Sequence, residues 1–169
     1  MRHAKSDWNI GTSSDFDRVL SERGNIDAPR MGQWLVNQGY SPDQVICSTA
    51  QRVKETIALV STNWKQDEDQ IIWEPAIYNA SLSQLLGTVA AEIKQGQITL
   101  LTGHNPGVSE LILHLGGDCI PIQASGNLMP TSAITALELT NINNIIDYGS
   151  WKIVDYMKPA NLAHNYKNS

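Results

Sequence analysis

The sequence predicts a single α/β domain over residues 1–169, built around a largely parallel sheet. Short apolar runs of strand length alternate along the chain with segments whose apolar residues recur at helical spacing. No internal repeat or break in composition divides the chain. With 41% hydrophobic and 17% charged residues in 169, the chain is long enough and apolar enough to bury a core.

Composition and charge narrow the classes of partner. The formal net charge of −5 argues against nucleic acid or an anionic membrane, so any anion site must be a local cluster of positive charge. No apolar run approaches about 18 residues, so no transmembrane helix is expected, and the first residues lack the apolar core of a signal peptide. Cys47 and Cys119 are too few for a disulfide scaffold and fit a reduced, cytoplasmic setting.

The first half of the chain alternates between helix and strand. Helices are expected over residues 27–38 and 50–63, where apolar residues recur every three or four positions. The segment "DQVICS" (43–48) is typical of a short buried strand, and "QIIWEPAIY" (70–78) indicates an extended segment broken by Pro75. The predicted core-facing residues of the two helices are Ala28, Met31, Trp34, Leu35, Val53, Ile57 and Val60.

Two further helices flank a buried strand. Ser81 and Gln84 have the spacing of a capping box, which begins the first of these helices. The continuous apolar run "QITLLTGH" (97–104) is typical of a strand buried on both faces. Asn105 then suits the N-cap of the next helix and Pro106 its first helical position. The apolar stripe of the helix after Ser81 contains Leu82, Leu85, Leu86, Val89 and Ile93.

The last part of the chain predicts a hairpin. The segments "SAITALELT" (132–140) and "GSWKIVDYM" (149–157) are strand-like and are joined across residues 141–148. Residues 158–169 are expected to form a loosely held tail.

Reactive side chains stand at the chain start and after two of the predicted strands. Arg2 and His3 open the chain, Ser48 and Arg52 follow one strand, and His104 ends another. In sheets of this kind, ligands bind beyond the carboxyl ends of the strands. Arginine forks match phosphate oxygens in a bidentate manner, and free N–H groups at a helix start add donors. The sequence therefore predicts a site that binds a phosphoryl group.

These stretches resemble the histidine phosphatase superfamily. The pairing of Arg-His-Ala-Lys-Ser with Gly-His-Asn-Pro-Gly is similar to its SixA-type phosphohistidine phosphatases rather than to its mutases, with Ala4 at a position that is glycine in the family signature. The resemblance covers most of residues 2–140 and implies a three-layer α/β/α sandwich with a mostly parallel, mixed sheet. The matching segments are "RHAKSDWN" (2–9), "LSERGNIDAPRMGQWL" (20–35), "CSTAQRVKET" (47–56), "LLTGHNPGVSEL" (100–111) and "MPTSAITAL" (129–137).

The resemblance implies a role for each of four residues. His3 would be the nucleophile, forming a covalent phosphohistidine that water then hydrolyses. Arg2, Arg52 and His104 would bind the equatorial oxygens of the phosphoryl group, where transition-state charge collects. No cofactor is implied, and the histidines and cysteines show no metal-ligand spacing, so a metal-independent hydrolase is expected.

Three polar residues have two competing interpretations. Ser6, Asn9 and Asn105 occupy positions where relatives contact phosphate or substrate. A turn that caps its own backbone would explain Ser6 and Asn9 equally well, and an N-cap would explain Asn105.

The sequence departs from the family pattern at the position of the general acid. Relatives that act on esters carry a glutamate where this chain has Asn79, and an amide cannot protonate a leaving alkoxide. Glu74 and Asp7 are candidate substitutes, with an ordinary surface carboxylate as the alternative for each. An imidazole leaving group, with a reference pKa near ~6.5, departs more readily, so a site without a strong acid favours P–N bonds.

Three functions are therefore compared. A phosphatase acting on protein phosphohistidine is the leading hypothesis. A phosphomonoesterase acting on a small molecule, or on phosphoserine or phosphothreonine, is the alternative in the same fold. A catalytically silent phospho-binding module is the third.

The chain start raises a separate question, because the family places a buried strand directly before Arg-His and only Met1 stands there. We expect that first strand to be missing from this sequence. Either Met1 is an internal methionine of a longer natural chain, or the chain is a fragment with a weakened site.

Overall fold

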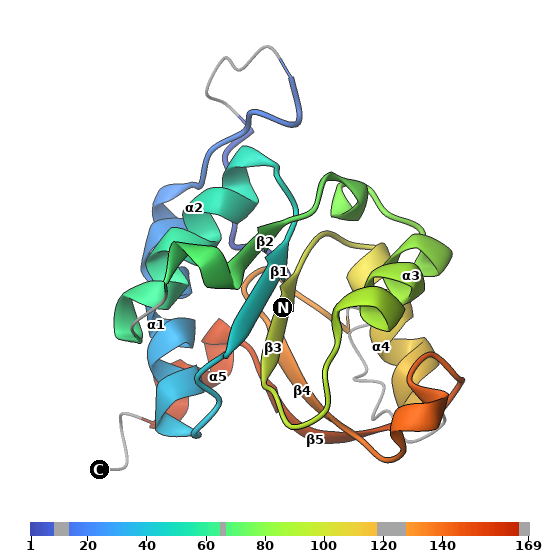
Figure 1. The fold of residues 1–169 in the computed structure, drawn as a ribbon. Coiled ribbons are helices and arrows are strands. Elements are labelled where there is room, and N and C mark those ends of the chain that lie inside the picture. Colours follow the sequence, from blue (N-terminus) through green and yellow to red (C-terminus); the bar gives the residue numbers. More distant parts are fainter. Residues whose placement is uncertain (9–13, 65–66, 118–127, 166–169) are drawn as a thin grey trace.

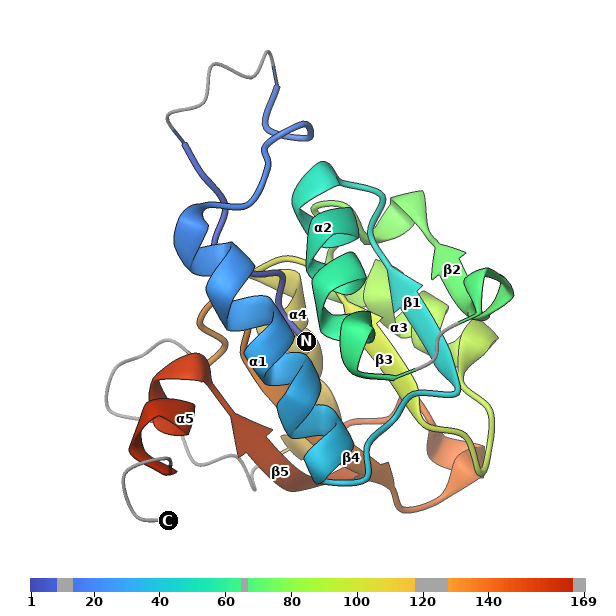
Figure 2. The same cartoon turned by 90° about the vertical axis from the view of Figure 1, so that its left-hand side faces the viewer.

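The computed structural model describes residues 1–8, 14–64, 67–117 and 128–165. Its strands form a middle layer with helices on both sides: α1, α2 and α5 cover one face, and α3 and α4 the other (Figures 1 and 2). The predicted α/β class and its three-layer arrangement are thereby confirmed. The helices are α1 (Glu22–Asn37), α2 (Gln51–Val60), α3 (Leu82–Glu92), α4 (Gly107–Gly116) and α5 (Pro159–Asn165).

The strands form a parallel sheet and an antiparallel ribbon. The parallel sheet has the order β2-β1-β3, in which Val45 of β1 pairs with Ile71 of β2 and Leu100 of β3. The predicted hairpin is also present, with β4 and β5 antiparallel. The strands are β1 (Gln44–Cys47), β2 (Ile71–Trp73), β3 (Thr99–Thr102), β4 (Ile134–Leu139) and β5 (Trp151–Met157), and short 3₁₀ turns are η1 (Ser61–Asn63), η2 (Glu68–Gln70), η3 (Pro75–Ile77) and η5 (Ile142–Asn144).

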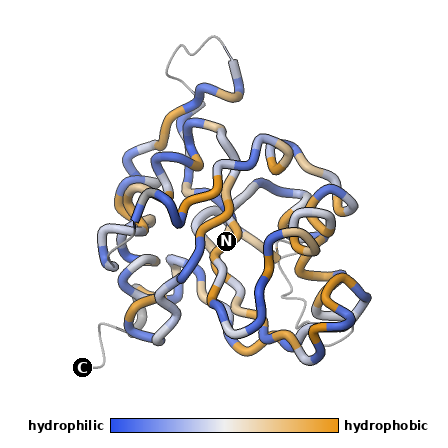
Figure 3. Tube along the Cα trace, viewed as in Figure 1, coloured by the Kyte–Doolittle hydropathy of each residue, from blue (hydrophilic) through white to orange (hydrophobic). Residues whose placement is uncertain are grey.

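The core lies on both sides of β1. Successive side chains of a strand point to opposite faces, and Val45 packs with the residues of α1 and α2 while Ile46 packs with those of α3 and α4. Both are fully buried, which is why the middle residues of β1 and β3 are apolar (Figure 3). None of the helices in the described part of the chain is both long enough and apolar enough to cross a bilayer.

The first three residues lie between β3 and the start of β4. Arg2 forms a parallel bridge with Gly103, the residue after β3, and the His3 N–H donates to the Gly103 carbonyl at 3.1 Å. On the other side, the Arg2 N–H donates to Ala133 at 3.0 Å and the Ser132 N–H donates to His3 at 3.1 Å. Within the described residues, no full strand element precedes α1, and these bonds hold His3 at the carboxyl end of β3.

Helix α1 begins five residues before its predicted start. Ser21 is the N-cap, and its Oγ accepts a hydrogen bond from the Gly24 N–H at 3.3 Å. The predicted core-facing residues of α1 are buried, and the helix ends before Gly39, whose φ of +77° suits glycine. The capping box at Ser81 is also confirmed.

Two local predictions are wrong. Asn105 is not the N-cap of α4: that position is Pro106, and the Asn105 amide instead donates to the Met129 carbonyl at 3.0 Å. The expected loose tail is helical over α5, where Leu162 is 7% exposed and packs in the core cluster next to α1. Residues 166–169 of that tail lie outside the described residues.

Candidate active site

A cavity of about 270 Å³ opens at the carboxyl ends of β1 and β3. It brings together six of the site residues expected from the sequence, although they come from three distant segments. Its lining residues are Arg2, His3, Lys5, Ser6, Trp8, Asp15, Arg18, Arg52, Asn79, His104, Asn105 and Thr131.

His3 is buried at 7% exposure, and one of its two ring nitrogens is hydrogen-bonded within the described residues. Its Nδ1 lies 2.7 Å from the Ala4 carbonyl oxygen, which can only accept, so Nδ1 carries the hydrogen and Nε2 keeps its lone pair. Burial lowers the pKa of His3 to about 3, and the charges of Arg52 and Arg2 act in the same direction. The ring is therefore neutral at neutral pH, as a nucleophile requires.

His104 faces His3, with ring centroids 5.1 Å apart. Its Nδ1 lies 3.2 Å from a terminal nitrogen of Arg52, and because a guanidinium only donates, Nδ1 is the acceptor. Nε2 then carries the hydrogen and donates to Ser48 Oγ at 2.9 Å. Burial, followed by the charge of Arg52, lowers the pKa of His104 to about 4.

The two predicted arginines flank this pair of rings and hold unused donors. Arg52 is 3% exposed and bonds Asp15 as well as His104. Arg2 donates to the Met129 carbonyl at 2.8 Å. The Nε atoms of both arginines are buried and have no hydrogen-bond partner in the described part of the chain. A buried donor without a partner is costly. Both arginines line the cavity, so their guanidinium groups are suited to bind an anionic ligand there.

Hydrogen bonds to the backbone hold these side chains in place. Thr56 of α2 is fully buried, and its Oγ1 accepts from the Ala4 N–H at 3.0 Å and donates to the Arg52 carbonyl at 2.6 Å. One hydroxyl therefore ties the helix that carries Arg52 to the segment that carries His3.

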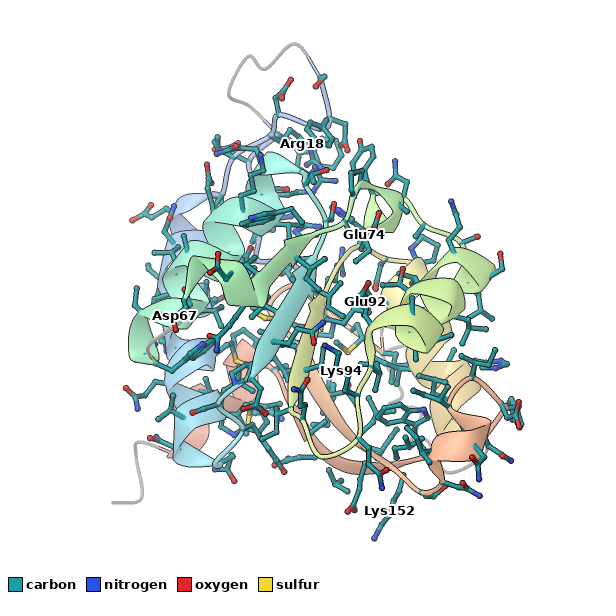
Figure 4. All side chains as sticks on the ribbon, in the orientation of Figure 1. Arg18, Asp67, Glu74, Glu92, Lys94 and Lys152 are labelled. Atoms are coloured by element: carbon teal, nitrogen blue, oxygen red, sulfur yellow. The ribbon has the colours of Figure 1, made fainter. Side chains whose placement is uncertain are left out.

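The sequence did not predict that Asp15, Arg18 and Tyr78 are connected to Arg52 by hydrogen bonds. The Asp15 carboxylate accepts hydrogen bonds from Arg18, Arg52 and Tyr78. The Arg18 guanidinium, labelled in Figure 4, also stacks 3.5 Å from the centroid of the Trp8 ring. Spacing of three between Asp15 and Arg18 is the one local signal, and it is weak because such pairs are common on surfaces.

Ser6, Asn9 and Asn105 were each expected either to contact the substrate or to cap the backbone, and the structure places two of them in the cavity. Ser6 is buried, lines the cavity and accepts a hydrogen bond from Arg18 at 3.0 Å. Asn105 also lines the cavity, and its Oδ1 accepts from the Ser109 hydroxyl at 3.0 Å. Asn9 lies outside the described residues.

The candidate acids do not line the cavity. Glu74, labelled in Figure 4, accepts a hydrogen bond from the Ala76 N–H at 2.8 Å and caps η3, and Asp7 is also absent from the described lining. Asn79 does line it, at a φ of +51° that asparagine tolerates better than most residues. The lining carboxylate is Asp15. Burial acts to raise its pKa, but the Tyr78 hydrogen bond and the charges of Arg52 and Arg18 outweigh burial and lower it.

Comparison with known proteins assigns the family. The model of the histidine phosphatase superfamily (branch 1) matches residues 1–102, more than half of the chain. The chain belongs to the histidine phosphatase superfamily. Among relatives of this histidine phosphatase, the protein Rv1276c of Mycobacterium tuberculosis is 32% identical over 168 residues, which span 94% of this chain and 99% of that protein. The protein ML1117 of Mycobacterium leprae is 27% identical over 165 residues, with the same coverage.

Solved structures support the SixA-type resemblance. A protein assigned as the phosphohistidine phosphatase SixA of Agrobacterium tumefaciens matches with a TM-score of 0.79 and 27% identity, covering 94% of this chain and 95% of that one. A protein histidine phosphatase SixA complexed with tungstate shares the fold, with a TM-score of 0.78 and 22% identity over 96% of each chain. Family and neighbours together support phosphatase activity on a phosphorylated substrate. Among the described residues, no group of three or more His, Cys, Asp or Glu is arranged to hold a metal ion.

Proposed function

We propose that this histidine phosphatase removes the phosphoryl group from phosphohistidine carried on a protein, through a covalent intermediate on His3. Two features of the cavity support the proposal. The Nε2 lone pair of His3 is available for attack, and the guanidinium groups of Arg2 and Arg52 line the cavity, where they can bind a tetrahedral anion. The fold relative complexed with tungstate, itself a tetrahedral oxyanion, binds a ligand of that shape.

The reaction proceeds in two displacements. His3 Nε2 donates its lone pair to phosphorus, and the bond from phosphorus to the substrate nitrogen breaks with its electron pair on that nitrogen. Arg2 and Arg52 stabilise the charge on the phosphoryl oxygens during transfer. His104 joins them when its Nε2–H turns from the Ser48 hydroxyl to a phosphoryl oxygen. Water then attacks phosphorus, the bond to His3 breaks, and inorganic phosphate forms.

The ionised carboxylate that lines the cavity is the reason for proposing phosphohistidine, rather than a phosphate ester, as the substrate. Expelling an alkoxide requires a protonated acid. The imidazole of a phosphohistidine whose other ring nitrogen carries a hydrogen instead departs as a neutral ring with little assistance. Asp15 is the carboxyl group among the described lining residues, and its lowered pKa keeps it ionised at neutral pH. Asn79 lines the same cavity and has no acidic proton to give. A site with these groups favours a P–N bond over a P–O bond.

A comparison of substrates tests the proposal. The protein is incubated with a ³²P-labelled phosphohistidine-bearing protein domain, a phosphoserine peptide, an aryl phosphate and a sugar phosphate. We expect release of phosphate from phosphohistidine with a far higher kcat/KM than from the esters. Equal or faster turnover of the esters would instead indicate a phosphomonoesterase, and binding without turnover would indicate a phospho-binding module.

Two histidine variants make the comparison specific to the site. His3→Ala removes the proposed nucleophile and should abolish turnover. His114→Ala is the matched control, because His114 lies outside the cavity and bonds the Ile146 carbonyl. An unchanged rate in His3→Ala would remove His3 from the mechanism.

A further inference from the structure

A carboxylate stands among the arginines of a pocket suited to phosphate. Asp15 Oδ1 accepts from Arg18 at 2.9 Å and 2.8 Å, and Oδ2 accepts from Arg52 at 3.1 Å and from the Tyr78 hydroxyl at 2.9 Å. A carboxylate has about four acceptor positions, so these donors fill them. Arg18, Arg52 and Tyr78 therefore surround a resident anion, as they would surround an oxyanion ligand.

Arg52 is shared between this resident anion and the phosphoryl position. One of its terminal nitrogens donates to the Asp15 carbonyl at 2.6 Å, and the other contacts both the Asp15 carboxylate and His104. A phosphoryl group held between the two histidine rings needs N–H groups of the same guanidinium. Asp15 and a bound phosphate thus compete for one set of donors, and their like charges repel each other.

The repulsion acts unequally on the species that form during the reaction. In a loose transition state, the group in transfer resembles metaphosphate and carries about one negative charge, whereas free phosphate at neutral pH carries more. A fixed negative charge therefore weakens the binding of product more than it raises the barrier to transfer. Asp15 is also 44% exposed at its side chain, so it can turn toward water without entering the core.

We propose that Asp15 lowers the affinity of the cavity for inorganic phosphate and so favours product release. The inference rests on the phosphatase function proposed above, but it concerns an equilibrium that does not depend on which phosphorylated substrate is used.

The test measures phosphate binding directly. Wild type, Asp15→Asn and Asp17→Asn are titrated with inorganic phosphate at pH 7.5 by isothermal calorimetry. Asparagine keeps the shape of Asp15 and removes its charge, and we expect phosphate to bind roughly tenfold more tightly, the effect of one charge a few ångströms away in a partly solvated site. Asp17 is the matched control, since it is exposed on the same loop and bonds Ser14.

A kinetic measurement separates this role from a structural one. Slower product release in Asp15→Asn should lower kcat and KM together, with stronger inhibition by added phosphate. A carboxylate that merely held Arg52 in place would, on removal, lower kcat without tighter phosphate binding.

If Asp15→Asn does not fold, phosphate binding is measured instead in Tyr78→Phe. It removes the hydroxyl that holds Asp15 but keeps the ring that packs on His104 and Phe16. It should also tighten phosphate binding, by a smaller factor.

Each outcome has a distinct meaning. Equal or weaker phosphate binding in Asp15→Asn, or in Tyr78→Phe where the former is unfolded, overturns the role of Asp15 and leaves the proposed phosphatase function intact. Phosphate binding by neither wild type nor variants overturns the role of Asp15, whereas the proposed phosphatase function is decided separately by turnover of the labelled substrates.

Discussion

Gly24 in the first turn of α1 lies against the segment that carries His3, and Gly24→Ala is expected to damage the site from a distance. A Cβ on Gly24 would lie 2.2 Å from the Lys5 carbonyl oxygen, whereas ordinary contact begins at 3.4 Å. The same carbonyl accepts hydrogen bonds from the Ser21 N–H at 2.9 Å and the Ser21 hydroxyl at 3.0 Å. The extra methyl group therefore has to separate two backbones that are bonded together.

The expected loss of stability in Gly24→Ala follows from this geometry. The backbones must part by roughly 1 Å, and such overpacking costs about 1–3 kcal/mol, while alanine returns at most about 1 kcal/mol through its helix propensity. With the full propensity gain subtracted, a net loss of about 0–2 kcal/mol is expected. Lys5 is two residues from His3, so a comparable displacement of the nucleophile lowers kcat by up to about 10².

Urea unfolding and steady-state kinetics of Gly24→Ala measure both effects. Gly87→Ala is the control, because Gly87 also lies within a helix but a Cβ there meets nothing within 4 Å. That control should be up to about 1 kcal/mol more stable and equally active. A Gly24→Ala protein as stable and as active as wild type would refute the claim that α1 positions the His3 segment.

Further predictions concern buried polar groups. Thr56→Val leaves the buried Ala4 N–H without its partner and should cost about 1–3 kcal/mol in chemical unfolding. Thr102→Val should be neutral or stabilising, because the buried Thr102 hydroxyl has no partner among the described residues; equal losses in both would contradict this. The free energy of unfolding should also fall as the pH drops below 6.5. Burial lowers the pKa of His3 to about 3 and that of His104 to about 4. Unfolded rings therefore take up protons from 6.5 downward while folded rings stay neutral, which costs roughly 2 kcal/mol per ring at pH 5. Urea titrations of wild type and His104→Gln at pH 7 and 5 check this, and a pH-independent wild type would refute it.

The sequence was sufficient wherever local periodicity controls structure. Strand β1 and the apolar face of α1 were predicted because burial on a strand or a helix face requires a repeating apolar pattern. Ser81 and Gln84 likewise signal a helix start through contacts between near neighbours. The predicted nucleophile and the three residues predicted to bind the phosphoryl oxygens also meet at one cavity, because parallel strands end at the same edge of a sheet.

What could not be predicted depends on partners remote in sequence. Asp15 binds Arg52 across 37 positions and Tyr78 across 63, and no local pattern records such contacts. Asn105 has the residue type of an N-cap, but its amide is engaged by Met129, 24 positions away. Leu162 is buried because α5 packs beside α1.

Trapping the intermediate on His3 tests the central claim most directly. The protein is mixed with a ³²P-labelled phosphohistidine-bearing domain, quenched in alkali within milliseconds to seconds, and digested for mass spectrometry. We expect label on His3 that rises and decays during turnover, persists in His114→Ala and is absent from His3→Ala. Full turnover with no label on His3, or with label on another residue, would contradict the mechanism.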